Sequence, residues 1–240
     1  MSERVWLIVP AAGRGRRMGA ERPKQYLTLA GASVMARTLA RLQRALPEAR
    51  LCLCLDAEDA WFSPTMVPFA DWRRVEGGAE RADSVVNALD ALAEEAANDD
   101  LVLVHDVARP CVHPADLARL REALVGEPVG ALLASPVADT MKRADAAGRI
   151  VATEPRDGLW HALTPQGFRY GLLCRALHHA RATGVAVTDE ASAVEALDLA
   201  PRLVAGRRDN LKITHPEDLA LAAQILAAQE APACSGETPA

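Results

Sequence analysis

Apolar runs alternate with amphipathic segments along most of the chain. The first run, residues 5–9, has the length and the β-branched content of a buried strand. The same reasoning predicts, in chain order, strand 5–9, helix 33–46, strand 51–55, helix 84–95, strand 101–105, helix 115–125 and strand 130–136. Such alternation is typical of an α/β fold, in which helices cover both faces of a mainly parallel, twisted sheet.

The pattern changes after residue 136. Residues 139–153 contain two short strand-like segments joined by a turn at Gly148, which predicts a protruding β-hairpin arm over about 137–157. An arm with polar tips and few core positions is poorly supported by its own domain, which favours contact with a partner subunit. Beyond the arm, the sequence predicts helices at 170–183 and 190–197, strands at 202–205 and 211–214, and a closing helix from Pro216.

Composition places the chain among globular proteins. Of its 240 residues, 50% are hydrophobic and 25% are charged, and no stretch reads as a linker, so we expect one domain over 1–230. The small residues at 231–240 predict a disordered tail. A net charge of −5 disfavours nonspecific binding to nucleic acid or membranes. Because no segment resembles a membrane span or a signal peptide, we expect a cytoplasmic protein.

Cysteine spacing indicates free thiols. The five cysteines form no CxxC pair, so neither a disulfide framework nor a zinc site is expected. Cys52 and Cys54 lie two positions apart in a predicted strand, which places both on the same face.

The segment after the first strand concentrates small residues and cations. The loop 10–13 (Pro-Ala-Ala-Gly) leads to Gly15, Arg17 and Lys24. Backbone N–H groups and converging positive charge are what a polyphosphate site requires, although a solvated basic turn is the alternative. The third glycine falls one place late for a dinucleotide fingerprint, and a Walker Gly-Lys-Ser/Thr tripeptide does not occur.

Polar residues also follow other predicted elements. Asp106 ends the third strand, where it could hold Mg²⁺ or a substrate hydroxyl, or merely pair with Arg109 to stabilise the turn. Gly77 and Gly78 precede a helix that Ser84 could cap, but a double glycine also permits close approach of a base or ribose.

Three further polar residues have open interpretations. Thr164 and Thr188 lie in polar clusters that either cap loops or contact a substrate. Lys212 lies in the apolar run 211–214, where strand alternation would make it an ordinary exposed lysine.

Taken as a set, these motifs resemble the 2-C-methyl-D-erythritol 4-phosphate cytidylyltransferase family from Val5 to about Ala222. The resemblance implies a Rossmann-like nucleotidyltransferase fold and transfer of CMP from CTP to 2-C-methyl-D-erythritol 4-phosphate, with Mg²⁺, in the non-mevalonate isoprenoid pathway. Each motif is weak alone, and the order of all of them carries the resemblance: Pro10 to Gly13, Arg17, Pro23 to Tyr26, Gly77 to Ser84, His105 to Cys111, Asp139-Thr140, Leu163 to Gln166, Thr188 to Ser192 and Asn210 to Lys212.

The resemblance also implies roles for individual residues. Arg17 and Lys24 look like the pair that stabilises the transition state, while Arg156 and Lys212 look like the catalytic residues that position the sugar phosphate, which replaces the exposed-lysine interpretation of Lys212. The implied nucleotide contacts are Pro10, Ala11, Ala12, Gly13, Gly15, Gly78, Ser84 and Asp106. The implied sugar-phosphate contacts are Asp106, Arg109, Thr140, Arg156, Thr164, Thr188 and Lys212.

Further implications concern metal and assembly. Mg²⁺ would be held mainly by the CTP phosphates, with Asp106 as a candidate ligand, and a homodimer would exchange its arms so that Arg156 acts in the partner's site. The chain departs from the family pattern at Val107, where alanine is common, and at Ala79, where a polar residue is familiar. The alternatives are a ribitol 5-phosphate cytidylyltransferase and a nucleotide-binding module without turnover, the latter disfavoured by the retained cations.

Overall fold

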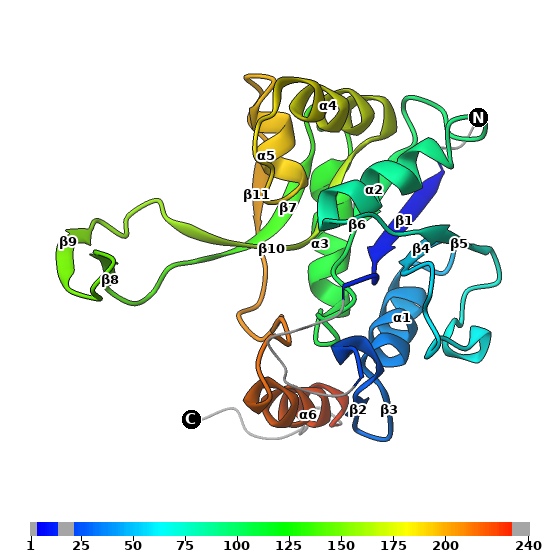
Figure 1. Ribbon diagram of the computed structural model, residues 1–240, viewed down its shortest axis with the longest axis horizontal. Helices are drawn as coiled ribbons and strands as arrows, with labels where there is room; N and C mark the ends of the chain where they lie inside the picture. Colours follow the sequence, from blue (N-terminus) through cyan, green and yellow to red (C-terminus); the bar gives the residue numbers. More distant parts are fainter. Residues whose placement is uncertain (1–3, 14–21, 232–240) are drawn as a thin grey trace, which may run out of the picture.

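A seven-stranded sheet forms the centre of the computed structural model, which describes residues 4–13 and 22–231 (Figure 1). Its strands lie in the order β11-β7-β10-β6-β1-β4-β5, and β10 alone runs antiparallel to its neighbours, which confirms the predicted mainly parallel sheet. The strands are β1 (Val5–Pro10), β4 (Arg50–Leu55), β5 (Trp72–Glu76), β6 (Leu101–Val104), β7 (Ala131–Pro136), β10 (Trp160–Arg169) and β11 (Arg202–Ala205).

Helices cover both faces of this sheet, as predicted. The division is visible in β1, where Leu7 and Val9 join one hydrophobic cluster while Trp6 and Ile8 join the other. Because all four side chains are buried, the strand reads as an uninterrupted apolar run. The first cluster includes residues of α1 (Val34–Ala45) and α3 (Pro114–Leu124), and the second includes residues of α2 (Arg81–Asp90), α4 (Tyr170–Thr183) and α5 (Glu190–Glu195).

A smaller cluster holds the closing helix against the body. Leu226 of α6 (Glu217–Glu230) is buried with Leu29 and Ile213, so the helix packs on the small β2–β3 hairpin and on the loop that precedes it (Figure 1). The remaining short elements are η2 (Lys24–Tyr26), η3 (Pro64–Met66), β2 (Thr28–Leu29) and β3 (Ala32–Ser33).

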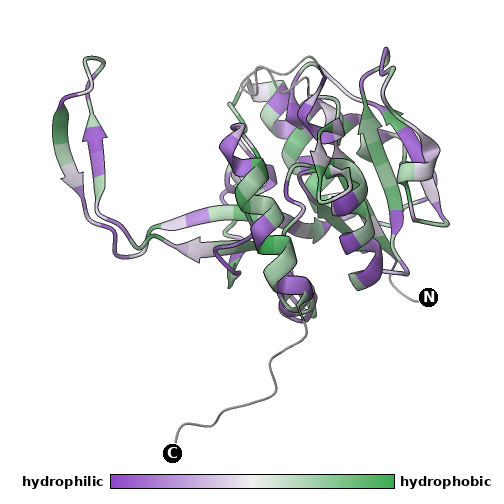
Figure 2. Cartoon of the chain, turned by 90° about the horizontal axis from the view of Figure 1, so that it is seen from below, coloured by the Kyte–Doolittle hydropathy of each residue, from purple (hydrophilic) through white to green (hydrophobic). Residues whose placement is uncertain are grey.

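A two-stranded hairpin projects from the body between β7 and β10 (Figures 1 and 2). Its strands, β8 (Met141–Ala144) and β9 (Ile150–Glu154), pair antiparallel within the predicted arm segment. No helix in the described part of the chain is long and apolar enough to cross a membrane. The predicted tail, 231–240, lies outside the described residues except for Ala231.

The structure differs from the sequence prediction at several elements. The predicted strand 211–214 is wrong, because the backbone there bonds to loops: Ile213 N donates to Ala108 O at 2.8 Å, outside any sheet ladder. The helix predicted at 84–95 begins and ends earlier, since α2 spans Arg81–Asp90. Strands β5 and β10 were not predicted; β5 carries four charged or half-exposed residues, and Pro165 interrupts the apolar pattern of β10.

Candidate functional site

A cavity of about 740 Å³ opens beyond the carboxyl ends of the parallel strands β1, β4 and β6. This is the edge at which open α/β sheets bind ligands. Its lining brings together nine residues predicted to be functional, namely Pro10, Ala11, Ala12, Gly13, Lys24, Gly78, Ser84, Asp106 and Lys212. Gly15 and Arg17 lie outside the described residues.

The small-residue loop after β1 is held at both backbone polar groups of Ala11. Ala11 N donates to Cys54 O at 2.8 Å, and the buried amide of Gln25 donates to Ala11 O at 2.7 Å. The Gln25 contact joins the loop to η2, the element that carries Lys24. Lys24 Nζ in turn donates to Ile213 O at 2.8 Å, next to Lys212. The two candidate lysines therefore approach the cavity from connected loops.

The second residue of the double glycine, Gly78, lines the opposite wall of the cavity, and Gly77 packs behind it. A Cβ at Gly77 would lie 2.3 Å from the Ala12 Cβ, so only glycine permits this approach of the two loops. Gly78 N donates to Ser84 Oγ at 3.0 Å, which ties the glycine loop to the first turn of α2. The predicted capping role of Ser84 is wrong, because Glu80 is the N-cap of α2; Ser84 instead fixes the loop that faces the cavity.

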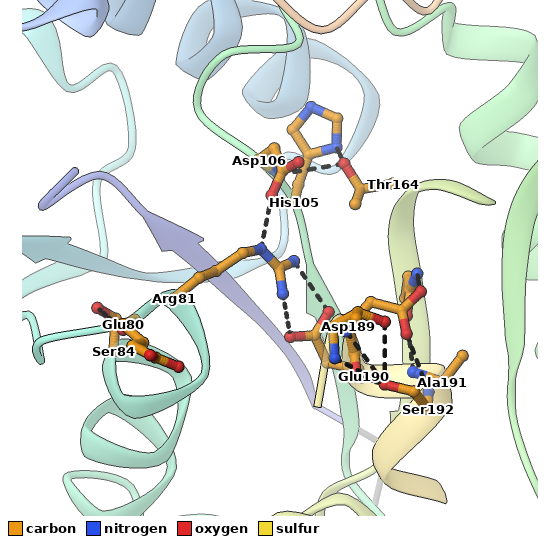
Figure 3. A network of polar contacts seen from close by, with 12 residues as sticks. Glu80, Arg81, Ser84, His105, Asp106, Thr164, Asp189, Glu190, Ala191 and Ser192 are labelled. Atoms are coloured by element: carbon orange, nitrogen blue, oxygen red, sulfur yellow. Dashed lines mark hydrogen bonds and ion pairs between the residues drawn. The ribbon is translucent and has the colours of Figure 1, made fainter. Parts of the chain in front are cut away.

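Asp106 lies at the centre of a cluster of cations. Its Oδ1 accepts from Arg81 Nε at 2.8 Å, and its Oδ2 accepts from Lys212 Nζ at 2.7 Å and lies 3.7 Å from Arg109 Nε (Figure 3 shows the Arg81 contact). Burial raises the pKa of Asp106, but the charges of Arg81, Lys212 and Arg109 outweigh it and hold the pKa well below its ordinary value. The carboxylate is therefore ionised and positions the cations around it.

A buried layer supports Asp106 from behind. The Asp106 N–H donates to Thr164 Oγ1 at 3.1 Å, and Thr164 O accepts from Asn210 Nδ2 at 2.8 Å. Arg109 Nη1 donates to Asn210 O at 2.7 Å and its Nε lies 3.7 Å from Asp106, which agrees with a role in stabilising the turn, while its contact with a sugar phosphate stays a prediction. Thr164 and Arg109 are buried and lie outside the residues that line the cavity.

Three predicted residues lie elsewhere in this single chain. Thr140 and Arg156 are exposed on the arm segment, where Arg156 donates to the Ala138 carbonyl. Thr188 is exposed before α5, and its hydroxyl lies 3.4 Å from Ser192 Oγ. None of the three lines the cavity.

Sequence reasoning missed Arg81 and Glu190 as site residues. Arg81 lines the cavity and joins Asp106 to Glu190, which is buried at the first position of α5. The signal available for each was its place inside a motif that carries the family resemblance, Gly77 to Ser84 for Arg81 and Thr188 to Ser192 for Glu190, but burial of a carboxylate is not visible in local sequence.

Carboxylates that could contact a metal are few in the cavity. Its lining includes Asp56, Glu80 and Asp106, and among described residues no group of three or more His, Cys, Asp or Glu side chains is arranged to hold a metal ion. Both oxygens of Asp106 already face cations. This donor set fits a Mg²⁺ ion that is carried mainly by a ligand's phosphates and not by a protein cage.

Comparisons with known proteins agree with the fold and identify the family. A family model for 2-C-methyl-D-erythritol 4-phosphate cytidylyltransferase matches residues 5–228. Proteins of that name from Chromohalobacter salexigens and Dechloromonas aromatica are 70% identical over 228 residues (95% of this chain, 92% of the relative) and 52% identical over 235 residues (95% and 99%).

Solved structures give the same result. A crystal structure of 4-diphosphocytidyl-2C-methyl-D-erythritol synthase superposes with a TM-score of 0.82 at 37% identity, covering 94% of this chain and all of the other. The 2-C-methyl-D-erythritol 4-phosphate cytidylyltransferase from Thermus thermophilus gives a TM-score of 0.76 at 34% identity, covering 93% and 99%. The chain belongs to the 2-C-methyl-D-erythritol 4-phosphate cytidylyltransferase family, whose members are nucleotidyltransferase enzymes.

Proposed function

We propose that the chain transfers a cytidylyl group from CTP to 2-C-methyl-D-erythritol 4-phosphate, forming 4-diphosphocytidyl-2-C-methyl-D-erythritol and pyrophosphate in isoprenoid biosynthesis. The observation that carries this proposal is the cavity in which the small-residue loop, Lys24 and Lys212 meet. It combines backbone donors with cations at one sheet edge, and the 70% identical relative bears the name of this activity.

In this proposal the nucleotide lies between the loop after β1 and the glycine loop. The backbone of Ala11 to Gly13 and of Gly78 would contact CTP, and Ser84 would keep the glycine loop in place through its bond to Gly78 N. The close approach of Gly77 to Ala12 supports this arrangement, because it sets the spacing of the two walls.

The chemistry requires no general base. The attacking phosphate monoester has a second pKa of about 6 and is already anionic at pH 7. Its oxygen attacks the α-phosphorus of CTP, a new P–O bond forms, and the bond to the β-phosphate oxygen breaks as pyrophosphate leaves. The protein's task is to bring two polyanions together and to neutralise the developing charge. Lys24 would do this from the cavity wall, together with Arg17, which lies outside the described residues.

The proposed role of Mg²⁺ is to neutralise the triphosphate oxygens. Each oxygen of Asp106 already accepts from a cation, Arg81 or Lys212, which supports the CTP phosphates as the main ligands of the ion. Lys212 would hold the sugar phosphate beside Asp106, with Arg109 and Thr164 supporting Asp106 from behind.

The arm supports the proposed homodimer. Ile150 and Val151 are 67% and 63% exposed on β9, and Met141 is exposed on β8. Apolar side chains on a thin hairpin are unfavourable in water, and a second copy of the chain could cover them. Exchange of the arms would bring Thr140 and Arg156 toward the partner's cavity. A cytoplasmic location is part of the same proposal, supported by the four free thiols of the described residues.

Mixing two inactive variants tests whether Arg156 acts in trans. If it does, a heterodimer of Lys24→Ala and Arg156→Ala chains contains one site with both residues intact. Random exchange of subunits should then restore up to about a quarter of wild-type activity, because half of the dimers are mixed and each has one of two sites repaired. Native mass spectrometry of differently tagged chains verifies exchange. Full exchange without recovered activity would contradict action in trans.

A pyrophosphate-release assay tests the activity itself. With CTP and Mg²⁺, we expect release with 2-C-methyl-D-erythritol 4-phosphate, little release with ribitol 5-phosphate, and none without a polyol phosphate. Preference for ribitol 5-phosphate would assign the alternative substrate. CTP binding without release from either polyol phosphate would indicate a nucleotide-binding module.

A further inference from the structure

A buried carboxylate behind the cavity has no role in the proposed reaction. Glu190 is 1% exposed at the start of α5, and its two oxygens accept from Arg81 Nη1 at 2.6 Å and Nη2 at 2.9 Å (Figure 3). Burial raises the pKa of Glu190, and the facing Arg81 charge opposes that effect. A two-pronged contact of this kind fixes both the position and the rotation of the guanidinium plane.

Glu190 is not needed to begin its own helix. Asp189 supplies the cap, since its Oδ1 accepts from Ser192 N at 2.9 Å. Gln166 Oε1 accepts from Ala191 N at 2.9 Å and ties the same turn to β10. The Glu190 side chain therefore contributes its charge to Arg81 and not to the cap of α5.

The Arg81 contact leads directly to the residues proposed to hold the sugar phosphate. With Nη1 and Nη2 facing Glu190, Arg81 meets Asp106 through Nε alone and engages only Oδ1. Oδ2 is thereby left for Lys212, at 2.7 Å. Negative and positive charges therefore alternate along Glu190, Arg81, Asp106 and Lys212. Lys212 lines the cavity.

We propose that Glu190 is a positioning residue, which occupies two of Arg81's donors so that Asp106 keeps one oxygen for Lys212. Without the Glu190 charge, Asp106 is the remaining anionic partner of the Arg81 guanidinium. The bidentate geometry that arginine favours would rotate both Asp106 oxygens toward Arg81 and release Lys212. This inference rests on the proposed function for its kinetic consequence, and on the contacts alone for its structural one.

Glu190→Gln tests the kinetic consequence. We expect kcat/KM for the methylerythritol phosphate to fall on the order of 10-fold to 100-fold at saturating CTP, because Lys212 is displaced, while the KM for CTP changes little. A purely electrostatic role predicts the opposite sign, since removing a negative charge should tighten binding of an anionic substrate. Glu190→Asp keeps the charge and should recover part of the loss. Glu195→Gln, an exposed carboxylate on the same helix, is the matched control and should behave as wild type.

Amine labelling of the folded proteins tests the structural consequence without reference to turnover. An amine-specific acylating reagent at limiting concentration, read by peptide mass spectrometry, should modify Lys212 faster in Glu190→Gln than in wild type, with Lys142 as internal reference, because an amine released from its carboxylate partner is more accessible to the reagent. Faster labelling in an enzyme that releases no pyrophosphate from any polyol phosphate would reject the proposed function and keep the positioning role.

Two outcomes overturn the proposal. One is unchanged Lys212 labelling with unchanged kcat/KM; the other is a lower melting temperature as the only effect. If Glu190→Gln does not fold, Arg81→Lys replaces it, because lysine keeps the charge but lacks the planar fork and should give the same loss specific to the polyol phosphate. Wild-type kinetics in Arg81→Lys would equally overturn the proposal.

Discussion

Lys24→Ala should lower kcat on the order of 100-fold or more while the protein remains folded. Lys24 lines the cavity beside the small-residue loop, where the α-phosphate of CTP is proposed to lie. In a reaction whose nucleophile is already ionised, charge neutralisation at the reacting phosphate is the main contribution that a side chain can make. Removal of this amine therefore acts on the transition state more than on substrate binding.

The measurement is steady-state pyrophosphate release at saturating CTP and polyol phosphate. Lys24→Arg keeps the charge and should lose less than Lys24→Ala. Arg181→Ala removes an exposed cation from the last turn of α4, far along the chain from the cavity loops, and should match wild type. Because Lys24 also donates to Ile213 O, circular dichroism and thermal melting should accompany the kinetics. A folded Lys24→Ala enzyme with near-normal turnover would reject this role.

The central strands were predictable because a strand that is buried on both faces has a continuous run of apolar residues. The run at 5–9 became β1, and the run at 101–105 became β6 with His105 just beyond its end. Each strand is followed by small or charged residues that line the cavity. Parallel-sheet topology explains why these residues meet, since it places the carboxyl ends of the parallel strands at one edge of the sheet.

The pattern failed where tertiary contacts, and not periodicity, determine the backbone. Residues 211–214 alternate like a strand, yet Ile213 bonds to Ala108 and Lys24 across loops, and this irregular path is what brings Lys212 to Asp106. Alternation would have pointed Lys212 at solvent. The family resemblance implied a role for Lys212 in the site, but only the structure shows the path of the loop that carries Lys212.

The buried charge cluster was equally invisible in the sequence. Arg81 and Glu190 are 109 positions apart, and each lies near a helix start, where charged residues are ordinarily exposed caps. Only the fold shows that Glu190 at the start of α5 faces Arg81 at the start of α2, which in turn contacts the buried carboxylate of Asp106 (Figure 3). Sequence reasoning therefore found the residues that line the cavity better than those that position them.

His105 should make the stability of the folded protein depend on pH between about 6.5 and 4. The side chain is completely buried, and burial lowers its pKa to about 4, from an ordinary value of 6.5. The neutral ring fits its surroundings: Nε2 lies 3.1 Å from Arg109 O, which can only accept, so we assign the proton to Nε2. Thr164 Oγ1, which accepts from Asp106 N, can then donate to Nδ1 at 3.1 Å.

Protonation of Nδ1 would place a positive charge in a completely buried site, and this burial penalty outweighs the opposing effect of the Asp106 carboxylate, so the folded state resists it. The unfolded chain takes up this proton near pH 6.5 and the folded chain only near pH 4. Stability from this residue is therefore fully present above about pH 6.5 and decreases as pH falls toward 4. The expected loss is roughly 3 kcal/mol in the free energy of unfolding, from a pKa difference of about 2.5 units at 1.36 kcal/mol each.

Urea unfolding at a series of pH values between 7.5 and 4.5 measures this loss. His105→Gln lacks the titrating ring, so its free energy of unfolding, although lower at pH 7.5, should decline much less over that range. His179→Gln changes an exposed histidine on α4 and should keep the wild-type slope. Equal slopes for wild type and His105→Gln would mean that other groups govern acid stability. Because the folded protein keeps His105 neutral until pH approaches 4, the contacts of His105 with Thr164 and of Thr164 with Asp106 should persist in the molecules that remain folded over this range.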